Sequence, residues 1–95
     1  MIIKWLEDAV QDLHQLRHYI AEHNPPAAQS IAIRIIDTVN LLVEQPGLGR
    51  PGHVPHTREL VITGTPFIIP YQVRGNVVEI LRVFHGAMLW PDKLP

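Results

Sequence analysis

Residues 57–85 read TRELVITGTPFIIPYQVRGNVVEILRVFH, and this stretch decides the fold. It contains three runs rich in β-branched and aromatic residues, each about as long as an ordinary strand. Breaks of hairpin length, which contain Gly64 and Gly75, separate the runs. We therefore expect an antiparallel meander. Its strands are predicted at Thr57–Thr63, Pro66–Arg74 and Val77–His85.

Pro70 stands in the middle of the second run. Proline has no N–H to donate to a neighbouring strand, so within a sheet it is found at edges or beside bulges. We expect either a bulge or an unpaired side of the strand at this position.

The first half of the chain shows helical periodicity. A brief apolar strand is expected at Ile2–Trp5, and apolar residues then recur at helical spacing as far as Ile20. The segment His23–Pro26 ends that helix and starts another, since Asn24 is a good N-cap and proline fits the first helical position. The second apolar stripe runs to about Glu44, and the short connection predicts an antiparallel helical hairpin.

These elements give the order β-α-α-β-β-β. We expect an α+β fold in which the helical hairpin packs on one face of a small antiparallel sheet and leaves the other face at least partly open. The Pro- and Gly-rich residues 45–56 are predicted to form a long loop, and loops of that length in compact domains are often functional. Residues 86–95 follow as a tail.

Composition narrows the class of protein. The chain has 95 residues and no cysteine, which suits one domain over residues 1–95 that folds without disulfides. No basic segment followed by an apolar block begins the chain, and no window approaches the length of a membrane span, so we expect a cytoplasmic protein without a membrane partner. The formal net charge is −1, whereas proteins that bind nucleic acid usually carry a basic excess.

Cationic residues interrupt the apolar strands. A positive group among apolar neighbours costs free energy unless it has a partner or a function. One interpretation groups four residues into a site for a phosphate or for a partner's carboxylates, namely Arg50, Arg58, Arg82 and His85. The other interpretation pairs Arg58 or Arg82 with Glu59 or Glu79 across the sheet. The residue types leave both interpretations open.

Metal and nucleophile chemistry have little support in the sequence. His14 and His18 are four residues apart on the first helix, a spacing that metal ligands use, but no cysteine and no HExxH motif accompanies them. Ser30 is the only serine, and it falls inside the second helix rather than in a nucleophile turn. We expect no metal site and no cofactor.

Motifs along nearly the whole chain resemble the RelE/ParE superfamily of type II toxins. They are Trp5, Asp12-Leu13, Tyr19-Ile20, Pro25 to Ala28, Pro46 to Arg50, Thr57 to Leu60, Tyr71 to Val73, Ile80 to His85 and Trp90-Pro91. The resemblance implies a helical hairpin on an antiparallel sheet. It also implies a cognate antitoxin, part of which wraps the toxin and keeps it inactive in a hetero-oligomer.

The resemblance implies one of two activities. ParE-like members poison DNA gyrase, and RelE-like members cut mRNA in the ribosome. For the nuclease, Arg58 matches the position of a catalytic arginine, His85 lies close to that of a catalytic histidine, and Arg82 would be a further catalytic residue. Met88 and Leu89, however, stand where a basic residue commonly follows in these toxins. The low net charge favours the gyrase inhibitor, with the ribosome-dependent endoribonuclease as the alternative.

The partner-binding surface is expected to combine cations with the apolar tail. Its residues are Arg50, Arg58, Arg82, Met88, Leu89 and Trp90. Acidic residues of the antitoxin would meet Arg58 or Arg82 while its apolar groups cover the helical hairpin. The apolar residues of the tail either fold back over the sheet or form an exposed contact for gyrase.

Overall fold

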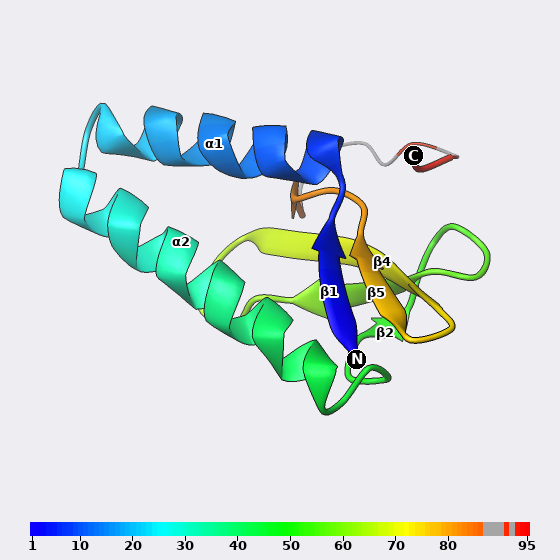
Figure 1. The fold of residues 1–95 in the computed structure, drawn as a ribbon. Helices are drawn as coiled ribbons and strands as arrows, with labels where there is room; N and C mark the ends of the chain where they lie inside the picture. Colours follow the sequence, from blue (N-terminus) through cyan, green and yellow to red (C-terminus); the bar gives the residue numbers. More distant parts are fainter. Residues whose placement is uncertain (87–90, 92) are drawn as a thin grey trace.

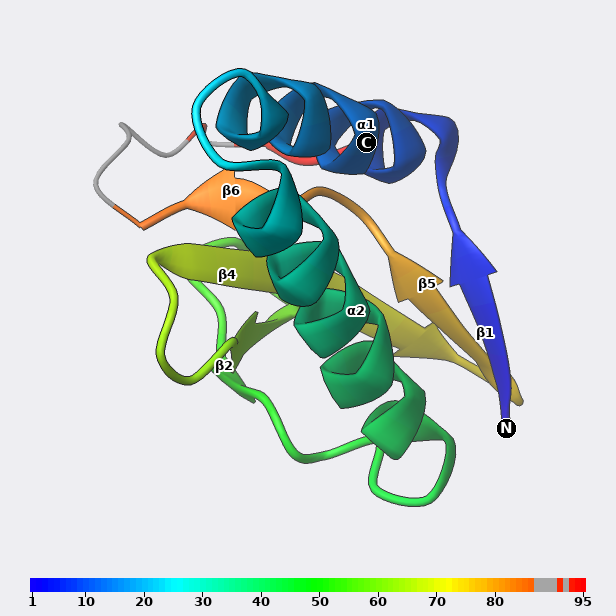
Figure 2. The same cartoon turned by 90° about the vertical axis from the view of Figure 1, so that its left-hand side faces the viewer.

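A computed structural model describes residues 1–86, 91 and 93–95 of the chain. Within these residues, two α-helices pack on a mixed sheet, and both helices lie on the same side of it (Figure 1, Figure 2). The elements are β1 (Ile2–Trp5), α1 (Glu7–Ala21), α2 (Pro25–Asn40), a 3-10 turn (Leu41–Val43), β2 (Arg50–Pro51), β3 (Arg58–Val61), β4 (Phe67–Arg74), β5 (Val77–Ile80) and β6 (Phe84–His85). The expected α+β architecture is confirmed.

The helical hairpin forms where the sequence predicts it. The side chain of Asn24 accepts a hydrogen bond of 3.1 Å from the backbone N–H of Ala27, and Pro25 occupies the first position of α2. This cap satisfies one of the donors that a helix N-terminus leaves unpaired. The α-helical part of α2 ends at Asn40, a few residues before the expected end, because the chain tightens into the 3-10 turn ahead of Pro46. In the described part of the chain, no helix is long and apolar enough to cross a bilayer.

The strand order is β1-β5-β4-β3-β2, so β1 and β2 lie at opposite edges of the sheet (Figure 2). The meander of β3, β4 and β5 is antiparallel, as expected. The pairing of β1 with β5 is parallel, which makes the sheet mixed rather than purely antiparallel. The connection between the two strands allows this: the helical hairpin and the strands β2 to β4 separate β1 from β5, and parallel pairing needs a long connection of this kind.

A bulge interrupts the last predicted strand opposite Pro70. Ile80 faces Tyr71 and Phe84 faces Ile68, so the three residues 81–83 lie opposite the two residues 69–70. The extra residue separates β5 from β6, so the single strand predicted at Val77–His85 is divided into two short strands. A bulge is thus present opposite Pro70, but it lies on the facing strand and not in the strand of Pro70, where either a bulge or an unpaired side was expected.

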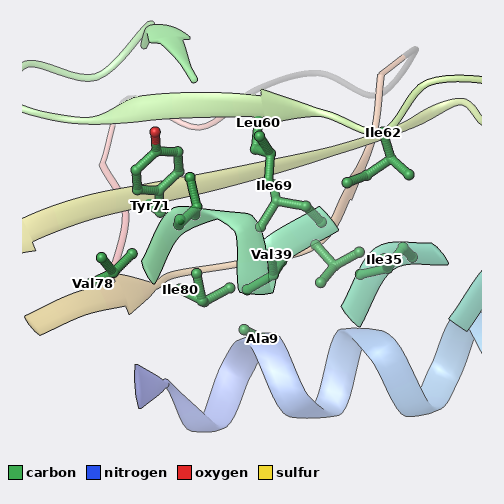
Figure 3. Close-up of a cluster of buried hydrophobic side chains, with 11 residues drawn as sticks. Ala9, Ile35, Val39, Leu60, Ile62, Ile69, Tyr71, Val78 and Ile80 are labelled. Carbon is green, nitrogen blue, oxygen red and sulfur yellow. The ribbon is translucent and has the colours of Figure 1, made fainter. Parts of the chain in front are cut away.

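The core lies between the helices and the sheet (Figure 3). Ala9 on α1 is fully buried, and its small side chain allows α1 to approach the sheet closely. Ile35 and Val39 extend from α2 into the same cluster. Tyr71 is also fully buried, but its hydroxyl points away from the apolar cluster, toward the loop that follows α2 (Figure 3).

Candidate functional site: the loop at residues 46–58 and the edge of β3

The cationic residues suggested by the sequence do not converge on one point. Arg58 faces Tyr71 in the sheet, and His85 faces Phe67. These two positions are four residues apart on β4, which offsets Arg58 and His85 by about 13 Å along the strand direction at ~3.3 Å per residue. β3 and β6 also lie on opposite sides of β4, so the two backbones are farther apart than this offset. The cluster of Arg50, Arg58, Arg82 and His85 is therefore not assembled as one site.

Arg82 is bound to α1. Its guanidinium donates two hydrogen bonds to the carboxylate of Asp12, at 2.7 and 3.0 Å, and the backbone N–H of Val83 donates a third at 3.0 Å. The guanidinium carbon also lies 4.9 Å from the ring centroid of Phe84. The hydrogen bonds to Asp12 raise the pKa of Arg82. Arg82 thus ties the bulge to the first helix.

Arg58 is bound to the loop. Its guanidinium donates to the backbone oxygen of Gly49 at 2.8 Å and, at 3.4 Å, to that of Gly47. The hydroxyl of Tyr71 donates to the backbone oxygen of Pro46 and accepts from the N–H of Gly49, both at 2.8 Å. A Cβ atom on Gly49 would lie 2.6 Å from the Tyr71 ring, so only glycine allows this close approach. Arg58 and Tyr71 together hold the start of the loop against the sheet.

Glu59 is the most deeply buried charge among the described residues, with 1% of its side chain exposed. Its carboxylate accepts hydrogen bonds from Nε of Arg50 at 3.1 Å and from the backbone N–H of His53 at 2.7 Å. It also contacts Nδ1 of His53, which must carry the proton because an ionised carboxylate only accepts. Burial alone would raise the pKa of Glu59, but the hydrogen bonds from His53 and Arg50 outweigh burial and lower it.

The ion pairs differ from those considered on the sequence. Neither Glu59 nor Glu79 pairs with Arg58 or Arg82. Glu79 instead forms an ion pair with Arg74, with an N–O distance of 3.2 Å, and accepts a hydrogen bond from Gln72 at 2.9 Å. Asp12, His53 and the Tyr71 hydroxyl were not identified as site residues, although Asp12 and Tyr71 stand within the motifs that carried the family resemblance.

The remaining candidates are placed as follows. His85 is exposed, with its ring edge-on to that of Phe67 at a centroid distance of 5.9 Å. Met88, Leu89 and Trp90 lie outside the described residues. No three acidic, cysteine or histidine side chains in the described ranges are grouped so that they could hold a metal ion.

A groove of about 360 Å³ opens at the edge of the sheet beside β3. We call it the edge groove. Its lining comes from the end of α2, the 3-10 turn, the loop, β2, β3 and the residues that follow β3. The lining residues are Thr38, Leu41, Leu48, Gly49, Arg50, Glu59, Leu60, Val61 and Thr63. Leu41, Leu48 and Val61 are 51%, 44% and 45% exposed, so the groove presents apolar surface to solvent.

Comparison with known proteins places the chain among small toxins. A sequence profile described as the ParE toxin of the type II toxin-antitoxin system parDE matches residues 3–90. A protein of Sinorhizobium fredii named "Putative toxin Y4kP" is 41% identical over 92 residues, covering 97% of this chain and 95% of its own. Toxin RelE2 of Caulobacter vibrioides is 37% identical over 87 residues, covering 92% of this chain and 97% of its own.

A solved structure supports the same grouping. The structure described as the chromosomal ParDE TA system from P. aeruginosa aligns with a TM-score of 0.79 and 34% sequence identity. The alignment covers 90% of this chain and 95% of the matching chain. The similarity therefore extends over the helices and the sheet together.

Proposed function

The chain belongs to the ParE toxin family of type II toxin-antitoxin systems, and we propose that it is a cytoplasmic ParE-like toxin that inhibits DNA gyrase and is neutralised by a cognate antitoxin. The toxin domain spans residues 1–95. The solved relative is described as a ParDE system, which supports both the ParE-like assignment and the pairing with an antitoxin.

The arrangement of Arg58, Arg82 and His85 supports a protein target rather than RNA. Cleavage of RNA without a metal needs a base, an acid and cations around a single phosphate. In this chain, the guanidinium of Arg82 is held by Asp12, and that of Arg58 is held by backbone oxygens of the loop. His85 is offset from Arg58 by about 13 Å along the strand direction, by the ~3.3 Å rise per residue of a strand, and the two lie on opposite sides of β4. These residues have structural partners and are not arranged around a common phosphate.

Charge supports the same choice. The chain carries eight Lys and Arg and nine Asp and Glu, for a formal net charge of −1. A protein that enters an RNA-rich site gains affinity from each phosphate it neutralises, and a basic excess is therefore expected of a ribosome-dependent nuclease. Inhibition of a protein enzyme has no such requirement.

The alternative is a RelE-like endoribonuclease that acts on mRNA in the ribosome. Two observations favour it. Toxin RelE2 of Caulobacter vibrioides is 37% identical to this chain, and His85 is exposed and thus accessible to a substrate. In this alternative, Arg58, Arg82 and His85 would be the catalytic residues, and ribosome binding would have to rearrange them.

The two candidates differ in what they inhibit. The toxin is titrated into a gyrase supercoiling reaction and, separately, into a cell-free translation reaction. Loss of supercoiling at concentrations that leave translation unchanged supports the proposal, and toxin premixed with the product of the adjacent reading frame is the matched control. Cuts in mRNA mapped by primer extension, with supercoiling intact, would contradict it.

The residues expected to bind a partner are proposed to contact gyrase. They are Arg50, Arg58, Arg82, Met88, Leu89 and Trp90. Arg50 is the cation of that set that lines the edge groove, and its side chain is 52% exposed despite its bond to Glu59. Met88, Leu89 and Trp90 remain proposed gyrase contacts on the basis of their apolar character.

A further inference from the structure

Arg17 differs from the other arginines of the chain, which has six. Five of them bind a carboxylate or a backbone oxygen of the fold, namely Arg34, Arg50, Arg58, Arg74 and Arg82. The side chain of Arg17, by contrast, forms no hydrogen bond or ion pair with another described residue. An arginine guanidinium carries five N–H donors, so all the donors of Arg17 are available to a ligand.

Arg17 lines a pocket between the two helices. The pocket has a volume of about 340 Å³ and lies near the turn that joins α1 to α2, away from β1 (Figure 1). We call it the hairpin pocket. Its polar lining comes from His14, Arg17 and His18 on α1 and from Gln29 on α2, and small or apolar residues of both helices form the rest. One permanent cation, two imidazoles and one amide therefore face the same hollow.

The three polar residues of α1 are neighbours because residues three or four apart share a helix face. Among the described residues that line the hairpin pocket, none is acidic. The carboxylate nearest to these groups is that of Glu22, which lies 3.7 Å from Nε2 of His18 and does not line the pocket. The pocket thus offers hydrogen-bond donors and positive charge that no carboxylate inside it neutralises.

The start of α2 adds to this positive character. The N-terminus of an α-helix carries a partial positive charge, which acidic residues in the first turn commonly offset. The first turn of α1 contains two acidic residues, whereas that of α2 contains none. Pro25 and Pro26 have no N–H, and the N–H of Ala27 donates to the side chain of Asn24. An anion in the hairpin pocket would therefore be held by side chains rather than by these backbone groups.

We propose that the hairpin pocket binds the phosphate group of a small ligand, with the guanidinium of Arg17 as the main contact and the imidazoles of His14 and His18 as further donors. A phosphate group brings three acceptor oxygens and up to two negative charges near neutral pH. The planar fork of an arginine can bond two of those oxygens at once. The hairpin pocket is separate from the edge groove, and this inference does not depend on the proposed action on gyrase.

The size and charge of the hairpin pocket favour a small phosphate monoester over other anions. Sites for small molecules have volumes of about 300–1,000 Å³, so this pocket is near the lower limit. A nucleic acid strand would need several cations spaced along its backbone, and Arg17 is the one permanent cation among the described lining residues. A carboxylate has a single charge and two oxygens, so it would use fewer of the available donors.

The test is an NMR titration of the intact chain. Inorganic phosphate, methyl phosphate and acetate are added separately at constant ionic strength, which keeps the screening of surface charge the same throughout. We expect saturable shifts of the amide signals of His14, Arg17, His18 and Gln29 with both phosphates. Acetate should bind at least about tenfold more weakly than methyl phosphate.

Variants then assign the binding to the hairpin pocket. Arg17→Gln removes the permanent charge, and Arg74→Gln is the matched control, because Arg74 is a 73% exposed arginine on β4. We expect Arg17→Gln to weaken the binding of methyl phosphate by about tenfold or more and Arg74→Gln to change it by less than about twofold. Thermal unfolding shows whether each variant is folded. His14→Gln should weaken binding by about threefold and keeps the test decisive if Arg17→Gln is unfolded.

Three results would each overturn the inference. Shifts that grow without saturation, or equal weakening in Arg17→Gln and Arg74→Gln, would mean that the anions only screen surface charge. Acetate that binds as tightly as methyl phosphate would make the hairpin pocket a carboxylate site. A short DNA duplex that shifts the same four amides and binds at least about tenfold more tightly than methyl phosphate would assign the phosphate to a nucleic acid rather than to a small ligand.

Discussion

Asp12 and Arg82 form a two-point ion pair between residues that are 70 positions apart in the sequence. The side chain of Asp12 is 13% exposed and that of Arg82 is 30% exposed, so water screens the ion pair only partly. The same carboxylate accepts from the backbone N–H of Val83, which lies in the bulge between β5 and β6. The side chain of Asp12 on α1 therefore holds both the guanidinium of Arg82 and the bulged backbone at Val83.

Removal of Arg82 should destabilise the fold. Arg82→Gln leaves the largely buried carboxylate of Asp12 with the N–H of Val83 as its remaining bond described here, and we expect the free energy of unfolding to fall by about 1–3 kcal/mol. Arg74→Gln is the matched control, because Arg74 is 73% exposed in its pair with Glu79 and should cost less than about 1 kcal/mol. Urea unfolding measures both. Equal losses in the two variants would mean that the Asp12 pair is no stronger than a surface pair.

Local patterns in the sequence predicted much of the fold, and long-range pairings explain what they missed. The cap at Asn24 and the breaks at Gly64 and Gly75 depend on neighbouring residues, so the helical hairpin and the meander could be read directly. The parallel pairing of β1 with β5 depends on where the chain returns after the hairpin, which no local pattern records. The bulge at residues 81–83 was indicated only from the facing strand, by the missing N–H of Pro70.

The partners of the candidate site residues could not be predicted for the same reason, because they come from distant parts of the chain. The sequence identified the arginines as unusual but not their partners, because Arg82 meets a carboxylate on α1 and Arg58 meets backbone oxygens of the loop. The burial of Glu59 could not be anticipated either, since it depends on His53 folding back over the strand. Leu60 and Ile62 are two residues apart and therefore share a face of the sheet, and both belong to the core.

Glu59 should make stability depend on acidic pH. Its pKa is lowered on folding from an ordinary value of 4.5, so its contribution is complete above that value and is lost as pH falls through the lower folded-state pKa. We expect the free energy of unfolding to decline as pH falls below about 4.5, and Glu59→Gln to flatten this decline. Urea unfolding at a series of pH values tests it, with Glu44→Gln as an exposed control. An unchanged pH profile in Glu59→Gln would show that other groups govern acid stability.

The Tyr71 hydroxyl should contribute to stability through the loop. Tyr71→Phe removes the acceptor of the Gly49 N–H and the donor to Pro46, and it leaves the N–H in a buried position without that partner. We expect a loss of about 1–3 kcal/mol in the free energy of unfolding. Tyr19→Phe is the control, because Tyr19 is 69% exposed and should change stability by less than about 0.5 kcal/mol. A loss below that of the control would mean that water replaces the hydroxyl at no cost.

His85 distinguishes a protein inhibitor from a nuclease. Histidine is the side chain best suited to proton transfer near neutral pH, so a nuclease that uses His85 would lose about 100-fold or more of its cleavage rate in His85→Gln. The side chain is exposed and contacts the ring of Phe67 at the end of the sheet, so we expect the variant to fold and to inhibit gyrase supercoiling within about twofold of the wild type. Phe67→Leu removes the ring contact and keeps the histidine, which controls for packing at this end of β4. Cleavage of mRNA by the wild type, lost in His85→Gln and retained in Phe67→Leu, would replace the gyrase inhibitor with the nuclease.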